Sequence, residues 1–137
     1  MIPIKNITRE GFKKYGDVLE PADKTKVFTV LCGEKENTGW RIGYVIIGPD
    51  NVKTIEAHPG SLETFEPVSG TSVILVAEKE SPDSIEAFLL DKAVVINKGV
   101  WHGLRAMSEK AEIKVTENYE VDSIFHELKK PIDIQFI

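Results

Sequence analysis

The sequence has one cysteine, three arginines and three histidines in 137 residues, and these scarcities narrow the classes of protein to consider. With Cys32 alone, no disulfide framework can form within the chain, as is usual in a reducing cytoplasm. No apolar run approaches the ~20 residues that a membrane-spanning helix needs. The N-terminal stretch lacks the basic start, apolar core and small-residue cleavage site of a signal peptide. We therefore expect a cytoplasmic protein without a membrane partner.

The charge balance argues against nucleic acid as a partner. The net charge is −5, and nearly all of the 17 cationic residues are lysines. An acidic chain is repelled by a phosphate backbone. Hydrophobic residues make up 42% of the chain and charged residues 28%, a balance that supports a packed core and argues against disorder. A length of 137 residues fits a single domain, which we expect over residues 1–137.

Short apolar segments with period two dominate the chain and are bounded by glycine and proline. They predict strands over residues 26–31, 40–47, 52–57, 62–65, 71–77, 85–90, 93–96, 104–107, 111–116 and 131–137. Two short helices are expected, one over residues 7–16 with Thr8 as its cap, and one over residues 123–128 with His126 on its surface. Many short strands at ~8–12-residue spacing with little helix are typical of an all-β sandwich or barrel.

The first chemical motif is EAHPGSLETFEPVSG, which begins at Glu56. Residues two apart in a strand face the same side, so Glu56 and His58 would point into one cavity. A Pro-Gly turn follows, and a strand that folds back beside the first would bring Glu63 near His58. Phe65 shares the parity of Glu63 and is a candidate apolar wall, although a place in the core fits it as well.

A second motif, NKGVWHG, holds Lys98 in a turn and His102 on the strand that follows. Together the two motifs resemble those of cupins. The matching patterns are Glu56-x-His58, four residues, Glu63, six residues and Gly70, and then Asn97-x-Gly99-x-x-His102. The resemblance implies a small antiparallel, jelly-roll-like barrel in which His58, Glu63 and His102 bind a divalent metal ion such as Ni, Zn, Mn or Fe. Two imidazoles and a carboxylate suit such an ion and leave coordination positions open.

Within the cupins, the chain resembles the ureidoglycolate lyase family. The motifs that carry this resemblance are Phe12-x-x-Tyr15-Gly16-Asp17-Val18, Glu56-x-His58-Pro59, Phe65-x-Pro67-x-x-Gly70 and Val100-Trp101-His102. The resemblance implies a lyase of allantoin degradation, part of purine metabolism, that splits ureidoglycolate into glyoxylate and urea. It implies Gln where this chain has Glu63, which is the better metal ligand. It also implies a homodimer that pairs edge strands, with the N-terminal and C-terminal strands as candidates.

These motifs suggest roles for individual side chains toward a small anionic substrate. Glu56, His102 and Lys98 are candidates for catalysis. Arg41, Phe65 and Lys98 are candidates for substrate binding, because a guanidinium matches a carboxylate. Lys98 fits a solvated turn equally well, and Glu56 fits an edge-strand charge that resists pairing. Two other functions fit the same motifs, since fold does not fix function: a metal-dependent isomerase or dioxygenase on a small hydroxy or keto acid, and a non-catalytic cupin that binds a small molecule.

Overall fold

The computed structural model describes residues 1–136, which fold into β-strands connected by turns and loops. There is no helix among these residues, and hence none that is long and apolar enough to span a bilayer. In chain order the strands are β1 (Ile2–Asn6), β2 (Gly16–Val18), β3 (Arg41–Ile47), β4 (Thr54–Ala57), β5 (Glu63–Ser69), β6 (Ser72–Ala77), β7 (Glu86–Leu89), β8 (Val94–Ile96), β9 (Trp101–Ala106), β10 (Ala111–Glu117), β11 (Ile124–Glu127) and β12 (Ile134–Phe136).

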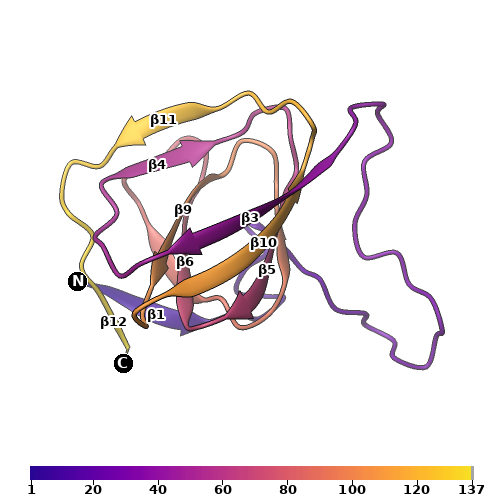
Figure 1. The fold of residues 1–137 in the computed structure, drawn as a ribbon, viewed down its shortest axis with the longest axis horizontal. Coiled ribbons are helices and arrows are strands. Elements are labelled where there is room, and N and C mark those ends of the chain that lie inside the picture. The colour runs from indigo at the N-terminus through magenta and orange to yellow at the C-terminus, as the bar shows by residue number, and fades with distance from the viewer. Residues whose placement is uncertain (137) are drawn as a thin grey trace.

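The strands form two sheets that curve around a common interior (Figure 1). The seven-stranded sheet has the order β11-β4-β9-β6-β7-β1-β12, and the five-stranded sheet has the order β2-β8-β5-β10-β3. Neighbouring strands are antiparallel except at β1, which is parallel to both β7 and β12. The predicted all-β, jelly-roll-like barrel is thereby confirmed, and the expected short helices are not part of it.

The core lies between the two sheets. Its largest members include Phe65 from β5, Ile74 from β6, Phe88 from β7 and Ile113 from β10, all buried. These residues alternate with outward-facing ones along their strands, as the period-two pattern predicted. Phe12, from the turns before β2, packs edge-on against Phe88 with ring centroids 5.2 Å apart and belongs to the same core.

Strand β6 is buried along its whole length, on both faces. Its inward face joins the core, while Val73 and Leu75 on its outer face contact Ile4, Ile132 and Ile134. The two chain ends therefore extend the larger sheet and add apolar side chains to a cluster on its outer face. The predicted strand over residues 131–137 corresponds to the shorter β12, and residue 137 lies outside the described residues.

Both predicted helices are wrong. Residues 9–15 form successive turns, in which Phe12 N–H donates to the Thr8 carbonyl at 3.0 Å and Gly11 N–H donates to the Thr8 hydroxyl at 2.9 Å. The turns end where Gly16 begins β2. Only glycine fits at this position, because a Cβ there would lie 1.7 Å from the Val95 carbonyl oxygen. Residues 124–127 form strand β11 instead of a helix, because β4 offers an edge to which they hydrogen-bond in antiparallel register.

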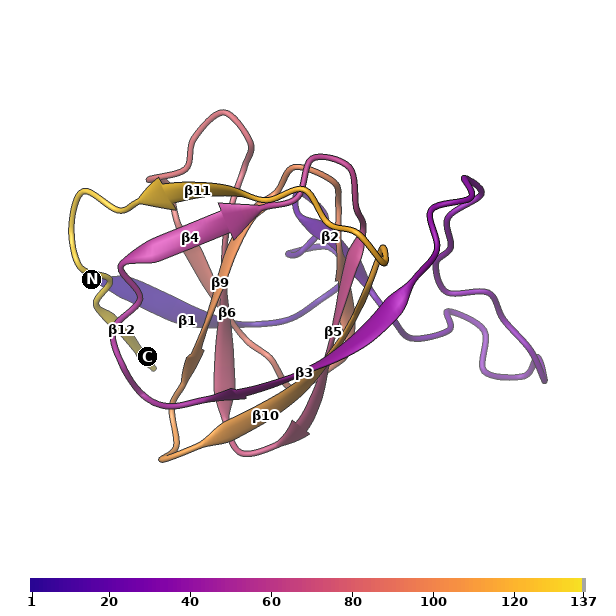
Figure 2. The same ribbon diagram turned by 45° about the horizontal axis from the view of Figure 1, so that its top comes forward.

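The predicted strand over residues 26–31 is also wrong. Residues 19–40, here called the arm, connect β2 to β3 without forming a strand. Every residue from 22 to 37 is exposed. Figures 1 and 2 show the arm extending away from the barrel in both views. The period of residues 26–31 is that of a strand, but no neighbouring strand in the described chain pairs with it.

Candidate metal centre and cavity

Three strands from both sheets bring the two motifs together. Glu56 in β4 lies directly opposite His102 in β9, within the seven-stranded sheet. His58 follows β4, and after the Pro-Gly turn the chain enters the other sheet, where Glu63 is the first residue of β5. Glu63 therefore reaches His58 across the barrel interior, and the expectation that β5 would pair beside β4 is wrong.

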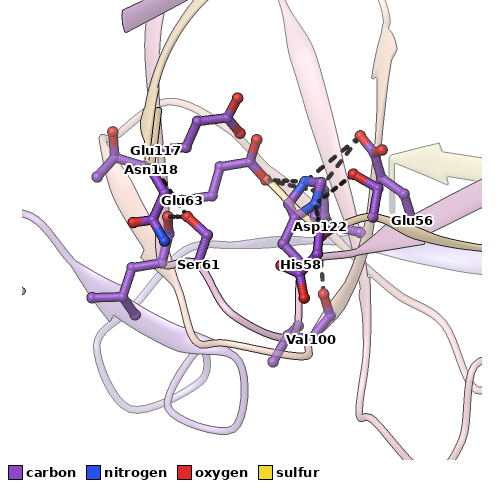
Figure 3. Close-up of polar contacts among 12 residues, drawn as sticks. Glu56, His58, Ser61, Glu63, Val100, Glu117, Asn118 and Asp122 are labelled. Atoms are coloured by element: carbon purple, nitrogen blue, oxygen red, sulfur yellow. Dashed lines mark hydrogen bonds and ion pairs between the residues drawn. The ribbon is translucent and has the colours of Figure 1, made fainter. Parts of the chain in front are cut away.

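The carboxylate of Glu63 lies between the two imidazoles. Its Oε1 is 2.8 Å from Nε2 of His102 and 3.3 Å from Nε2 of His58. Glu56 approaches from the other side, with Oε1 3.9 Å from Nε2 of His102 and 4.0 Å from Nε2 of His58. Figure 3 shows these contacts converging from β4 and β5. His58, Glu63 and His102 are buried, whereas the Glu56 side chain is 40% exposed.

Backbone carbonyls orient both rings. Nδ1 of His102 lies 3.1 Å from the Val100 carbonyl oxygen, and Nδ1 of His58 lies 3.2 Å from the carbonyl oxygen of Asp122. A neutral imidazole that donates from Nδ1 has an unprotonated Nε2. In this tautomer both Nε2 atoms offer lone pairs toward the same carboxylates. Such outer hydrogen bonds typically fix metal-binding histidines in proteins.

The residues fit a divalent cation. Oε1 of Glu63 and Nε2 of His102 are buried without a hydrogen-bond partner of suitable geometry among the described residues. Glu56, His58 and His102 offer ligand atoms within 4.8 Å of one another, and so do His58, Glu63 and Glu117. Mixed imidazole and carboxylate ligands suit borderline divalent ions. The site therefore meets the chemical requirements of a metal centre, with either carboxylate as a ligand beside the histidines.

Without a cation, the imidazole and carboxylate side chains of the site stabilise one another's ionised forms. Burial lowers the pKa of His58, but the carboxylates of Glu63 and Glu56 outweigh it and raise that pKa to about 9. Burial likewise raises the pKa of Glu63, but the neighbouring imidazoles of His102 and His58 lower it to about 2. A proton on His58 thus takes the place of a positive ion beside Glu63, and a metal that binds to Nε2 must displace it.

A ladder of charged side chains links this centre to the edge strand. Glu117 in β10 lies opposite Glu63 in β5 and opposite Arg41 in β3. Nε and Nη2 of Arg41 donate to Oε2 of Glu117 at 2.9 Å and 2.7 Å. Burial and the neighbouring Glu63 raise the pKa of Glu117, and Arg41 opposes that rise. Like charges opposite each other destabilise a sheet, and here the guanidinium compensates for the pair.

Neither sequence motif includes Glu117, although the sequence carries a signal for it. Ile113 and Val115 alternate inward along β10, and Glu117 continues the same parity by two residues. An acidic residue at an inward position directly after an apolar face is a candidate site residue. The register that sets Glu117 against Glu63 could not be read from the sequence.

A cavity of about 720 Å³ opens onto the candidate metal centre and includes Arg41, Phe65 and Glu117 in its lining. The ring of Phe65 packs edge-on against His102 with centroids 5.5 Å apart, so it belongs to the core and to the cavity wall. Lys98 is not among the described residues that line the cavity. Its Nζ pairs with Glu34 of the arm at 2.8 Å, and we therefore assign it no part in the chemistry.

The turn between β4 and β5 is fixed by hydrogen bonds to residues 118–122. Asn118 N–H donates to the Ser61 hydroxyl at 3.0 Å, and Gly60 N–H donates to the Asp122 carboxylate at 3.1 Å. The second motif is tied to the first through the backbone, since Gly99 N–H donates to the His58 carbonyl at 3.1 Å. Gly99 has φ of 83°, a conformation that favours glycine.

Comparisons with known proteins identify relatives of this chain and a solved structure with a similar fold. Ureidoglycolate lyase 2 of Rhizobium meliloti (strain 1021) is 26% identical over 134 residues, covering 79% of this chain and 82% of that protein. Ureidoglycolate lyase of Agrobacterium fabrum (strain C58) is 25% identical over 122 residues, covering 74% of each. The crystal structure of a dTDP sugar isomerase from Desulfovibrio desulfuricans G20 shares the fold, with a TM-score of 0.56 over 84% of this chain and 83% of that one at 13% identity.

The family model described as ureidoglycolate lyase matches residues 44–134, which is more than half of the chain. The matched region includes both motifs, the turn between β4 and β5, and Glu117. This chain therefore belongs to the ureidoglycolate lyase family.

Proposed function

We propose that the protein is a metal-assisted carbon–nitrogen lyase that splits ureidoglycolate into glyoxylate and urea. The observation that carries the proposal is the position of Glu63 Oε1, 2.8 Å and 3.3 Å from the Nε2 atoms of His102 and His58 at the buried end of a cavity. Membership of the family supports the substrate.

The residues that would hold a divalent ion are His58, Glu63 and His102. Such an ion would supply Lewis acidity to the hydroxyl and carboxylate oxygens of a bound hydroxy acid. Arg41 lines the same cavity, and Glu117 holds its guanidinium through Nε and Nη2. Its Nη1 remains available to the substrate carboxylate, because a guanidinium carries five N–H donors.

Glu56 is placed to act as the base. Its carboxylate is partly exposed and faces both imidazoles from the cavity side opposite Glu63. Glu56 accepts the proton of the substrate hydroxyl, and the electron pair of that O–H bond forms the carbonyl of glyoxylate. The carbon–nitrogen bond breaks, and the departing nitrogen keeps its electron pair. The protonated Glu56 then returns a proton to this nitrogen, which leaves as urea, so the proton count balances.

Incubation of the purified protein with racemic ureidoglycolate tests this proposal. Zn²⁺, Ni²⁺, Mn²⁺ and Fe²⁺ are supplied in separate reactions, and urea and glyoxylate are both measured. We expect equal amounts of the two products above the uncatalysed rate, and a loss of at least ~100-fold in Glu56→Gln. No turnover with any of the four ions would refute the substrate and would favour another reaction on a small hydroxy or keto acid.

A further inference from the structure

Phe125 on β11 is a large apolar side chain that packing within the described chain does not explain. It is 67% exposed and belongs to none of the three apolar clusters. A single exposed aromatic residue is normal on a protein surface, so its location decides whether it has a role. Phe125 lines the cavity that opens onto the candidate metal centre. An aromatic ring in the wall of such a cavity is a typical contact for a bound small molecule.

Strand parity places the ring of Phe125 on the inner face of the larger sheet. Strand β11 runs along β4 (Figures 1 and 2), and Phe125 lies opposite Glu56 in this pair. The next residue, His126, lies opposite Ile55. Ile55 belongs to the apolar cluster on the outer face together with Trp101, and the ring of His126 lies against Trp101 with centroids 5.8 Å apart. Neighbouring residues of a strand face opposite sides, so Phe125 points to the inside, as Glu56 does.

Phe125, Glu56 and His102 form a row of cross-strand neighbours on β11, β4 and β9. Side chains directly opposite each other have Cβ atoms about 5 Å apart. The ring of Phe125 therefore lies beside the carboxylate of Glu56, on the side away from His102. The His102 side is filled, because Oε1 of Glu63 lies 2.8 Å from the Nε2 of His102. A group that binds at Glu56 and extends along this row therefore extends over Phe125.

The proposed reaction indicates which part of the substrate lies there. The departing nitrogen must lie at the carboxylate of Glu56, because Glu56 returns a proton to it. The substrate carboxylate binds at Arg41, which belongs to β3 in the other sheet. The rest of the ureido group lies on the far side of the departing nitrogen from that carboxylate, and it therefore covers the ring of Phe125.

We propose that Phe125 recognises the ureido group and makes the cavity selective for N-carbamoyl acids over acids that lack this group. The inference rests on the proposed function, which supplies the orientation of the substrate. A ureido group is planar, and its N–H and C=O groups point outward in that plane. An aromatic ring stacks on its flat face while these groups keep hydrogen bonds to water in the open cavity. The ring and the substrate together also shield Glu56, whose side chain is 40% exposed, from water.

Isothermal titration calorimetry with two ligands that cannot react tests this role. N-carbamoylglycine has the carboxylate and the ureido group without the hydroxyl, and glycolate has the carboxylate and the hydroxyl without the ureido group. With Zn²⁺ present, we expect Phe125→Ala to bind N-carbamoylglycine about 10-fold more weakly and to bind glycolate within ~2-fold of the wild type. Phe125→Tyr keeps the ring and should bind both ligands as the wild type does. An unchanged affinity for N-carbamoylglycine, an equal loss for both ligands, or a wild type that does not bind N-carbamoylglycine would each overturn the proposal.

Ile124→Ala is the matched control for Phe125→Ala. Ile124 is the preceding residue of β11, is 47% exposed, and lies opposite Ala57 of the outer apolar cluster. We expect both affinities and the turnover of ureidoglycolate to be unchanged in this variant.

Steady-state kinetics distinguish this inference from the proposed reaction. Phe125→Ala should raise the KM for ureidoglycolate about 10-fold with little change in kcat, because the ring contacts the ureido group before and during the reaction. A wild type without turnover would refute the reaction alone, since the calorimetric comparison uses unreactive ligands. Turnover by Phe125→Ala with the KM of the wild type would refute the role of Phe125 alone.

Discussion

Oε1 of Glu63 lies 2.8 Å from Nε2 of His102, although the two residues belong to different sheets, on β5 and β9. The contact crosses the interior of the barrel, so both atoms are buried and neither has access to bulk water. Burial of two such groups is costly unless they are compensated. A cation bound by these two residues and His58 would remove that cost. Four predictions concern this centre and its neighbours.

We expect the protein to bind one divalent ion per chain through its two buried histidines. His58→Ala and His102→Ala should each lower the affinity for Zn²⁺ by at least ~100-fold, since each removes a ligand. Isothermal titration calorimetry measures this directly. His126→Ala is the matched control, because His126 lies on β11 with its Nε2 3.1 Å from Asp83 and outside the cavity lining. Equal affinity in all three variants would contradict the site.

Glu63→Gln tests the buried carboxylate that lies between the two imidazoles. A neutral amide replaces a carboxylate of nearly the same size, so the barrel should keep its fold while the metal affinity falls about 10-fold or more. Competition with a chelator of known affinity measures the difference. An unchanged affinity would mean that Glu56, and not Glu63, provides the carboxylate ligand.

The stability of the metal-free protein should fall at alkaline pH. The pKa of His58 is about 9 in the folded chain against 6.5 for an ordinary histidine, so the folded state holds the proton more tightly. This contribution is complete below pH 6.5 and is lost as the pH rises through 9, and it amounts to at most about 3 kcal/mol. Urea unfolding at pH 6.5 and pH 9.5, with a chelator present, measures it.

His58→Ala supplies the reference for that measurement, because other groups also titrate in this range. The wild type should lose more stability than the variant between the two pH values. Parallel losses in both proteins would show that the charge on His58 does not contribute.

Glu117→Ala should weaken substrate binding more than turnover. Without its partner, the Arg41 guanidinium is no longer held over the cavity, so we expect KM to increase about 10-fold. This increase corresponds to a loss of about 1.4 kcal/mol in the free energy of substrate binding. Glu117→Gln should recover much of the loss, since the amide oxygen still accepts from Arg41. Steady-state kinetics with ureidoglycolate separate the two parameters. Glu112→Ala, on the outward face of the same strand, is the control and should leave KM unchanged.

Much of the fold followed from local pattern. The alternating residues 111–116 formed a strand with one apolar face, and the continuous apolar run in residues 71–77 formed a strand that is buried on both faces. Residues 123–128 were predicted as a helix, but hydrogen bonding to the edge of β4 outweighs their local helix propensity. Residues 26–31 had the right period but no partner strand within the described chain. The hydrophobic period of a segment does not show whether another strand lies beside it to pair with.

The candidate site could likewise be predicted only in part. Strand parity placed Glu56 beside His58, which is a local property. Glu63 and His102 were joined to them through the resemblance to cupins and not through a local rule. Glu117 depends on the register between β5 and β10, which no local pattern specifies. The position of Lys98 depends on a contact with Glu34, which is far from it in sequence.

The hydrogen bond from Gly99 N–H to the His58 carbonyl has a further consequence. The two halves of the centre are joined by main-chain atoms, so their relative placement does not depend on which side chains they carry. Ligands can therefore be exchanged one at a time on an unchanged frame. A barrel built in this way is a suitable host for redesigned metal chemistry, with position 63 as the first residue to vary.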